Sequence, residues 1–183
     1  MKNPYQLLDT REIYRNELFR FREDLVEGPS GKRFSFSVAE VKPGSSILPL
    51  TDDGHVYLIR EYKYAIGRTS TEAAAGAMEE GETPLAGAQR ELREELGLTA
   101  REWIEFGRVD PFTTQLLSPN YMFLALGIEK TSRDPDEAEV LEMVKVKLDE
   151  AVQMVMRGEI THAPSCTLIL KAQNWLRANN STA

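Results

Sequence analysis

The sequence contains little cysteine and histidine. Cys166 is the single cysteine among 183 residues, so a disulfide within the chain is excluded. This is compatible with a reducing cytoplasm. The two histidines, His55 and His162, have no partner at the spacing that metal ligands adopt, and the sequence alone assigns them no role.

Long apolar runs are missing as well. No stretch approaches about 18 consecutive apolar residues, the length expected of a membrane-spanning helix. The first residues, MKNPYQLLDTRE, lack the apolar core of a secretory signal. We therefore expect a cytoplasmic protein that has no membrane partner.

Positive charge is in deficit, because 22 lysines and arginines oppose 29 aspartates and glutamates, for a net charge of −7. An acidic surface disfavours nonspecific binding to nucleic acid, whose phosphates dominate such affinity. We expect no nucleic-acid partner. A small phosphate-bearing substrate would meet the same repulsion unless bound cations supplied positive charge.

The length and the 42% hydrophobic content are those of one globular domain with at most a small appendage. That appendage is predicted at the N-terminus. Residues 18–26 favour a strand and residues 27–31 a turn, after which Phe34, Phe36 and Val38 alternate with serines. A lone hairpin is marginally stable, so it must pack on the main body or on a second subunit. We predict a strand-rich, dimerising subdomain at residues 1–44 and the main domain at residues 45–183.

Periodicity in the main domain predicts an α/β fold in which helices pack against a mixed sheet. Expected strands cover residues 45–50, 55–61, 101–109, 121–128 and 140–148, and expected helices cover residues 83–96, 149–157 and 165–178. The first two strands should pair across the turn at residues 51–54. In the first helix Leu85, Leu92 and Leu96 share one stripe, and Gly97 follows as a C-cap glycine.

Acidic residues crowd onto this first helix. Glu91, Glu94 and Glu95 are spaced so that their carboxylates share a face. So much like charge would destabilise the helix and raise the carboxylate pKa values. A hard divalent cation reverses the effect, because Mg²⁺ or Mn²⁺ takes oxygen ligands and keeps waters that phosphates can replace. The alternative is a solvated helix face on which Arg90 and Glu94 form an ordinary ion pair.

A longer pattern surrounds this cluster. Gly76 is followed by Glu82, then by Arg90-Glu91-Leu92, Glu94-Glu95 and Gly97-Leu98. This resembles the box of Nudix hydrolases: Gly, five residues, Glu, seven residues, Arg-Glu-aliphatic, one residue, Glu-Glu, one residue, Gly-aliphatic. Every specified position matches, and a chance match has a probability on the order of 10⁻⁹ per starting position.

The resemblance implies a fold and a metal site. The family's fold is an α/β/α sandwich around a mixed sheet, which suits the periodicity described above. Glu91, Glu94 and Glu95 would be ligands of Mg²⁺ or Mn²⁺, and Glu94 would count among the catalytic residues. A backbone carbonyl near Ala75 or Gly76 would complete the ligand set.

The other box residues would be structural. By the same resemblance, Arg90 and Glu82 would form an internal ion pair that holds the loop against the helix. Gly76 would allow a close approach of the backbone, and Gly97 would end the helix and turn the chain.

Flanking residues resemble one branch of the family. Residues 58–67 and 72–76 are similar to enzymes that hydrolyse ADP-ribose or nucleoside diphosphate sugars to a nucleoside monophosphate and a sugar phosphate. N-terminal strands in that branch commonly build a dimer that shares active sites, so we predict a homodimer. Two departures stand out: Glu72-Ala-Ala-Ala-Gly76 replaces the usual Glu-Leu-Pro-Ala-Gly, and residues 110–115 replace a Ser-Pro-Gly-like turn.

Two other functions remain open. The same chemistry could act on dinucleoside polyphosphates or damaged nucleoside triphosphates, although compact triphosphate enzymes need no N-terminal extension. A non-catalytic module would bind a nucleotide without cleaving it. Loss of a box glutamate would be the signature of such a module, and none is lost.

Candidate residues also lie outside the box. By resemblance, the general base comes from an acidic loop after it, and Glu139 is preferred to Glu137 because it adjoins the next expected strand. The competing interpretation is a solvated acidic loop. The residues expected to bind phosphate, ribose or base, each of which could instead be an ordinary surface charge, are Arg60, Lys63, Arg68 and Glu72.

Overall fold

A computed structural model of the chain describes residues 1–132 and 141–180. They form two compact units, one made of residues 1–43 and 110–119 and the other of the remaining described residues. The sequence analysis placed residues 110–119 in the second domain, because nothing in their composition sets them apart. No helix among the described residues has the length and apolar character to cross a membrane.

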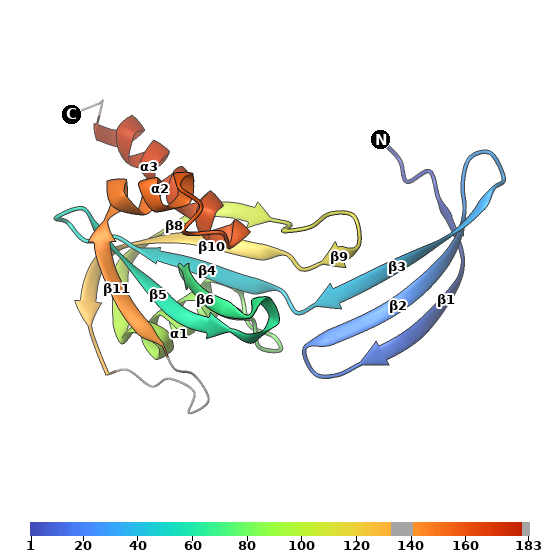
Figure 1. Ribbon diagram of the computed structural model, residues 1–183, viewed down its shortest axis with the longest axis horizontal. Coiled ribbons are helices and arrows are strands. Elements are labelled where there is room, and N and C mark those ends of the chain that lie inside the picture. The colour runs from blue at the N-terminus through green and yellow to red at the C-terminus, as the bar shows by residue number, and fades with distance from the viewer. Residues whose placement is uncertain (133–140, 181–183) are drawn as a thin grey trace. The chain divides into compact units, whose positions relative to one another are not determined.

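The first unit is a twisted sheet with the strand order β1-β2-β3-β9 (Figure 1). Its strands are β1 (Gln6–Arg15), β2 (Phe19–Glu27), β3 (Arg33–Val41) and β9 (Leu116–Leu117). The predicted hairpin is β2 and β3, which pair antiparallel up to Glu27 and Arg33. Strand β1 is exposed along its whole length, so it lacks the alternation by which a strand is recognised in sequence.

The second unit contains two sheets. The strand order of the mixed sheet is β7-β4-β10-β8, and that of the antiparallel sheet is β11-β5-β6. The strands are β4 (Gly44–Pro49), β5 (His55–Lys63), β6 (Arg68–Glu72), β7 (Ala74–Ala77), β8 (Leu98–Val109), β10 (Asn120–Lys130) and β11 (Glu142–Lys147). The helices are η1 (Tyr64–Ile66, a 3₁₀ turn), α1 (Pro84–Leu96), α2 (Leu148–Met156) and α3 (Ala163–Asn180).

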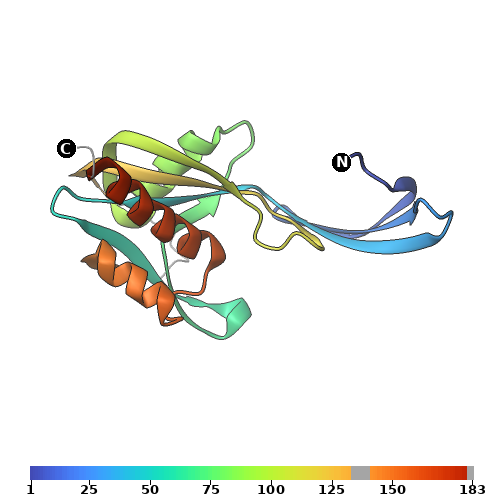
Figure 2. The ribbon, with the colours of Figure 1, turned by 90° about the horizontal axis from the view of Figure 1, so that it is seen from above.

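Helices cover both faces of these sheets (Figures 1 and 2). Successive residues of a strand point to opposite faces, and β4 shows the result. Ile47 packs with Leu92 of α1 in one core cluster, while Leu48 packs with Leu168 of α3 in the other. The predicted α/β/α arrangement around a mixed sheet is therefore confirmed.

The predicted pairing of the first two strands of the main domain was wrong. Strands β4 and β5 lie in different sheets and share one isolated bridge, Leu50 to Val56. A strand has two hydrogen-bonding edges. Those of β4 are taken by β7 and β10, and those of β5 by β6 and β11.

Local sequence signals set the bounds of α1. Thr83 caps its N-terminus by accepting a hydrogen bond from the Ala86 N–H, and Pro84 occupies the first turn. Gly97 ends the helix at a φ of 62°, a conformation that favours glycine. The predicted apolar stripe holds for Leu92, whereas Leu85 is 38% exposed. A polar residue lies at the first turn instead, since the Ser45 hydroxyl donates to the Pro84 carbonyl at 2.8 Å.

This difference between two leucines of α1 gives a stability prediction. Leu92→Ala removes a fully buried side chain and is expected to lower the free energy of unfolding by about 3 kcal/mol. Leu85→Ala should lower it by less than about 1 kcal/mol. Urea unfolding followed by circular dichroism measures both. Equal losses would contradict the placement of α1.

Candidate active site

The three box glutamates lie on α1 beside β7. The side chains of Glu91 and Glu94 are 12% and 28% exposed, and Glu95 is buried. Glu95 Oε2 accepts a hydrogen bond from the backbone N–H of Ala75 at 3.0 Å. A Cβ at Gly76 would overlap the Glu91 carboxylate. Two of the three carboxylates thus lie against the backbone of β7.

Arg90 joins these carboxylates to the loop before the helix. Its Nε and Nη2 each donate to Glu82 at 3.1 Å. Its Nη1 donates to Glu91 at 2.8 Å and to Glu94 at 3.0 Å, and Nη2 also donates to the Ala77 carbonyl. The guanidinium therefore contacts Glu82, Glu91 and Glu94 of the box, and the expected Arg90–Glu82 pair forms.

The Arg90 contacts fix the charge state of the loop. Hydrogen bonding to Glu82, followed by the contacts with Glu91 and Glu94, raises the pKa of Arg90 although burial opposes the shift. The hydrogen bond from Arg90 in turn lowers the pKa of Glu82, and the backbone N–H of Glu79 contributes at 2.9 Å. Glu82 is consequently an anion at neutral pH and holds the loop against α1.

The donor set fits a hard divalent cation. Glu91 Oε1 and Glu94 Oε2 accept from the same nitrogen of Arg90, so they already converge on one cationic group. Carboxylate oxygens are what Mg²⁺ and Mn²⁺ prefer, and the Glu91 carboxylate lies against the backbone of Gly76, where a side chain would displace it. Within residues 1–132 and 141–180, no three acidic, histidine or cysteine side chains are yet grouped to hold an ion.

The structure brings Lys63 and Glu72 to the box. Glu72 is 8% exposed at the end of β6. Burial alone would lower the pKa of Lys63, but its ion pair with Glu61 and the nearby charges of Glu72 and Glu95 raise it. Lys63 thus lies within the electrostatic reach of a box glutamate and of Glu72.

Arg60 and Arg68 are held elsewhere. The side chains of Arg60 and Lys63 lie on opposite faces of β5, because side chains alternate along a strand. Arg60 approaches Glu142 of β11 at 3.4 Å. Arg68 donates from Nη2 to Thr161 Oγ1 at 2.8 Å. The expected general bases, Glu139 and Glu137, lie outside the described residues.

His162 and Ser165, to which the sequence analysis gave no role, form a contact beside Glu72. His162 Nδ1 is 3.4 Å from Glu72 Oε2 and 2.8 Å from Ser165 Oγ. Burial lowers the pKa of His162, the charge of Glu72 opposes that shift, and the charge of Lys63 adds to it. The spacing of residues in the sequence could not reveal this cluster, because Lys63 comes from β5, Glu72 from β6, Ser165 from the start of α3 and His162 from just before it.

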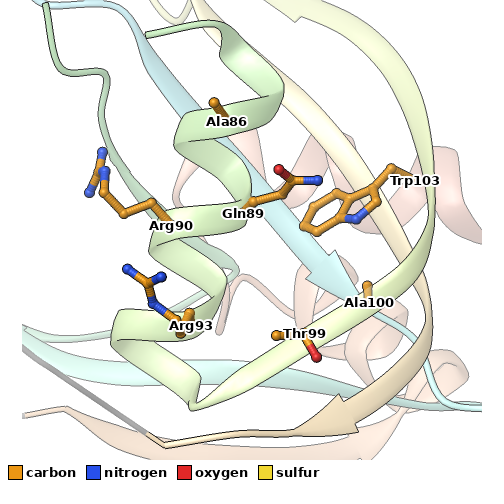
Figure 3. A pocket seen from close by; sticks show the side chains of 7 residues that line it. All are labelled: Ala86, Gln89, Arg90, Arg93, Thr99, Ala100 and Trp103. Atoms are coloured by element: carbon orange, nitrogen blue, oxygen red, sulfur yellow. The ribbon is translucent and has the colours of Figure 1, made fainter.

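A pocket of about 430 Å³ lies between α1 and β8. In Figure 3, Gln89 points across it toward Trp103, while the guanidinium groups of Arg90 and Arg93 extend away from that ring. Arg90 lines this pocket and also donates to Glu91 and Glu94. The pocket and the acidic cluster therefore share Arg90.

The chain is similar in sequence and in fold to known proteins. The sequence matches the NUDIX domain family over residues 41–165. An ADP-ribose pyrophosphatase of Bacillus subtilis is 28% identical over 86% of this chain and 86% of its own. A protein with the same description from Mycobacterium tuberculosis is 27% identical over 88% of this chain and 80% of its own. The fold also matches a crystal structure described as an ADP compounds hydrolase, with a TM-score of 0.84, 21% identity and coverage of 97% and 96%.

The pH dependence of stability tests the Arg90–Glu82 pair. The pKa of Glu82 lies below its usual 4.5 in the folded chain, so the pair stabilises fully above about pH 4.5 and less as the pH falls through the folded value. Glu82→Gln is expected to cost about 1 to 2 kcal/mol at pH 7 and less as the pH falls to 3. Urea unfolding at both pH values measures this, with the exposed Glu80→Gln as control. A loss that is independent of pH would contradict the assignment.

Proposed function

The chain belongs to the NUDIX family and is a hydrolase, and on that premise we propose that it cleaves the pyrophosphate of ADP-ribose or a nucleoside diphosphate sugar. The products are a nucleoside monophosphate and a sugar phosphate. The observation that carries the proposal is the set of Glu91, Glu94 and Glu95 beside β7, with Arg90 holding two of them. The descriptions of the relatives support a substrate that contains ADP.

The chain's own residues prepare the site for Mg²⁺ or Mn²⁺. Glu91, Glu94 and Glu95 would hold the ion with the carbonyl of Ala75, and the absence of a side chain at Gly76 lets the Glu91 carboxylate lie against the strand backbone. When bound, such an ion neutralises phosphate charge and lowers the pKa of a bound water. Arg90 keeps the carboxylates close together until the ion arrives, because its positive charge offsets their repulsion.

Substrate contacts are proposed for Lys63 and Glu72. Lys63 presents an ammonium near the acidic cluster and can neutralise a phosphate. The buried carboxylate of Glu72 can accept hydrogen bonds from ribose hydroxyls or a base amine. Glu139 stays the proposed general base on the sequence resemblance alone.

A homodimer and a cytoplasmic location complete the proposal. The sheet of the first unit supports the homodimer by exposing large apolar side chains. Leu7, Ile13, Tyr14 and Leu18 are 47–59% exposed, and Phe36 is 38% exposed. A second copy of the chain would bury them, and such burial drives association.

The substrate assignment is tested by release of phosphomonoester from a panel of compounds. The panel contains ADP-ribose, nucleoside diphosphate sugars, dinucleoside polyphosphates and nucleoside triphosphates, each with Mg²⁺ and with EDTA. We expect metal-dependent cleavage of the ADP-ribose or sugar members. Preference for polyphosphates would reject the substrate class, and ligand binding without turnover would favour the non-catalytic module.

Glu95→Gln separates chemistry from folding in the same assay. The amide can still accept the hydrogen bond from Ala75 but binds a cation poorly, so turnover should fall by about a hundredfold or more. The melting temperature should change little. Glu102→Gln, an exposed substitution on β8, serves as the control. Full activity of Glu95→Gln would reject the ligand assignment.

Removal of residues 1–42 tests the dimer. The shortened chain is expected to be monomeric by light scattering and to bind substrate more weakly, because it loses most of the exposed sheet. Leu7→Glu with Ile13→Glu, which places charges on that sheet while keeping the chain intact, should have the same effect on association. A truncated protein that stays dimeric and fully active would refute the dimer proposal.

A further inference from the structure

Ser165 contacts the residue that joins β6 to β7, just before the box. It lies near the start of α3 and is completely buried. Its Oγ accepts a hydrogen bond from the backbone N–H of Ala73 at 2.9 Å. The same oxygen is 2.8 Å from His162 Nδ1. Ser165 therefore links α3 to the residue that follows Glu72.

A second hydrogen bond holds the same segment from another element. The N–H of Ala75 donates to Glu95 of α1 at 3.0 Å. Ala73 and Ala75 are thus fastened by helices that cover different faces of the sheets. Between them, Ala74 pairs with Ile47 of β4.

These restraints matter because the segment cannot fix itself. Ala73, Ala74 and Ala75 carry only methyl groups, and no proline restricts their backbone. A buried backbone N–H that loses its acceptor is unfavourable. The backbone around Ala75 is therefore held from outside the segment, by these two hydrogen bonds and by the pairing of Ala75 with Ser46 of β4.

Two residues before Ser165, Thr161 and His162, contact the two ends of β6. Thr161 accepts from Arg68 at the start of β6, and His162 lies 3.4 Å from Glu72 at its end. His162 thus stands between the Ser165 hydroxyl and the Glu72 carboxylate, and each of these groups restricts the orientation of the imidazole.

We propose that Ser165 is a positioning residue: through the Ala73 N–H it fixes the backbone carbonyl of Ala75 as a metal ligand, and His162 holds the hydroxyl in place. This rests on the proposed function, in which the Ala75 carbonyl joins the box glutamates. Ser165 itself touches neither the ion nor the substrate. Its effect is on the affinity for the ion.

The test measures Mn²⁺ binding by electron paramagnetic resonance, without substrate. Ser165→Ala is expected to weaken Mn²⁺ binding about fivefold, the effect of losing one hydrogen bond. The metal concentration for half-maximal turnover should rise by the same factor, while KM for ADP-ribose at saturating metal stays unchanged. Thr167→Ala is the matched control, because it removes an exposed hydroxyl of α3 that bonds to Ala163.

Hydrogen exchange gives a readout that needs no metal. In the metal-free protein, the Ala73 amide should exchange at least about fivefold faster in Ser165→Ala than in the wild type, and in Thr167→Ala it should not change. Unchanged Mn²⁺ affinity together with unchanged Ala73 exchange would overturn the proposal. So would weaker binding of equal size in both variants.

His162 variants keep the proposal testable if Ser165→Ala does not fold. His162 is partly exposed, with 31% of its side chain accessible. His162→Ala should weaken Mn²⁺ binding about threefold, and His162→Asn, which retains a polar atom near the Nδ1 position, should restore it. Equal affinity in wild type and His162→Ala would overturn the role of His162 in holding the hydroxyl.

Glu95→Gln separates this inference from the proposed function. If Glu95→Gln weakens Mn²⁺ binding and Ser165→Ala does not, only the inference about Ser165 fails. If Glu95→Gln leaves Mn²⁺ binding unchanged, the ion binds elsewhere, and the proposed site fails together with the inference.

Discussion

The guanidinium of Arg90 is the contact on which the acidic site depends. Glu91 and Glu94 would repel each other on adjacent turns of α1, and Glu82 adds a third charge from the preceding loop. Arg90 donates hydrogen bonds to all three. A lysine could not replace it, because only a planar guanidinium gives two parallel bonds to Glu82 and still reaches the helix.

Small residues are the second requirement of this arrangement. A Cβ at Gly76 would overlap the Glu91 carboxylate, and one at Gly44 would come within 2.9 Å of the Gly76 carbonyl. Strand β7 therefore lies so close to β4 and to α1 that a side chain at Gly44 or Gly76 would not fit. This close stacking lets the carboxylates of α1 reach the strand backbone, where Glu95 accepts the Ala75 N–H.

Local signals allowed α1 to be predicted from sequence, whereas the Arg90–Glu82 pair was expected from the family resemblance. The helix was expected at residues 83–96 and begins one residue later, because the cap residue Thr83 and Gly97 mark its ends. The pairing of β4 with β5 was predicted wrongly, since which strands occupy an edge depends on distant parts of the chain. Strand β1 gave no alternation to recognise because it is wholly exposed.

The contacts of Ser165 and His162 show why spacing cannot reveal the whole site. Ser165 bonds to a backbone N–H that is 92 residues away in sequence, and a backbone donor has no residue identity that a motif could record. The box specifies the carboxylates of α1. The alanines that lie beside them also form a hydrogen bond with α3, through Ala73 and Ser165. If the Ala75 carbonyl binds the ion as proposed, its alignment depends on the hydrogen bonds that Ser165 of α3 and Glu95 of α1 accept from the N–H groups of Ala73 and Ala75. A site of this kind is therefore a property of the three layers together.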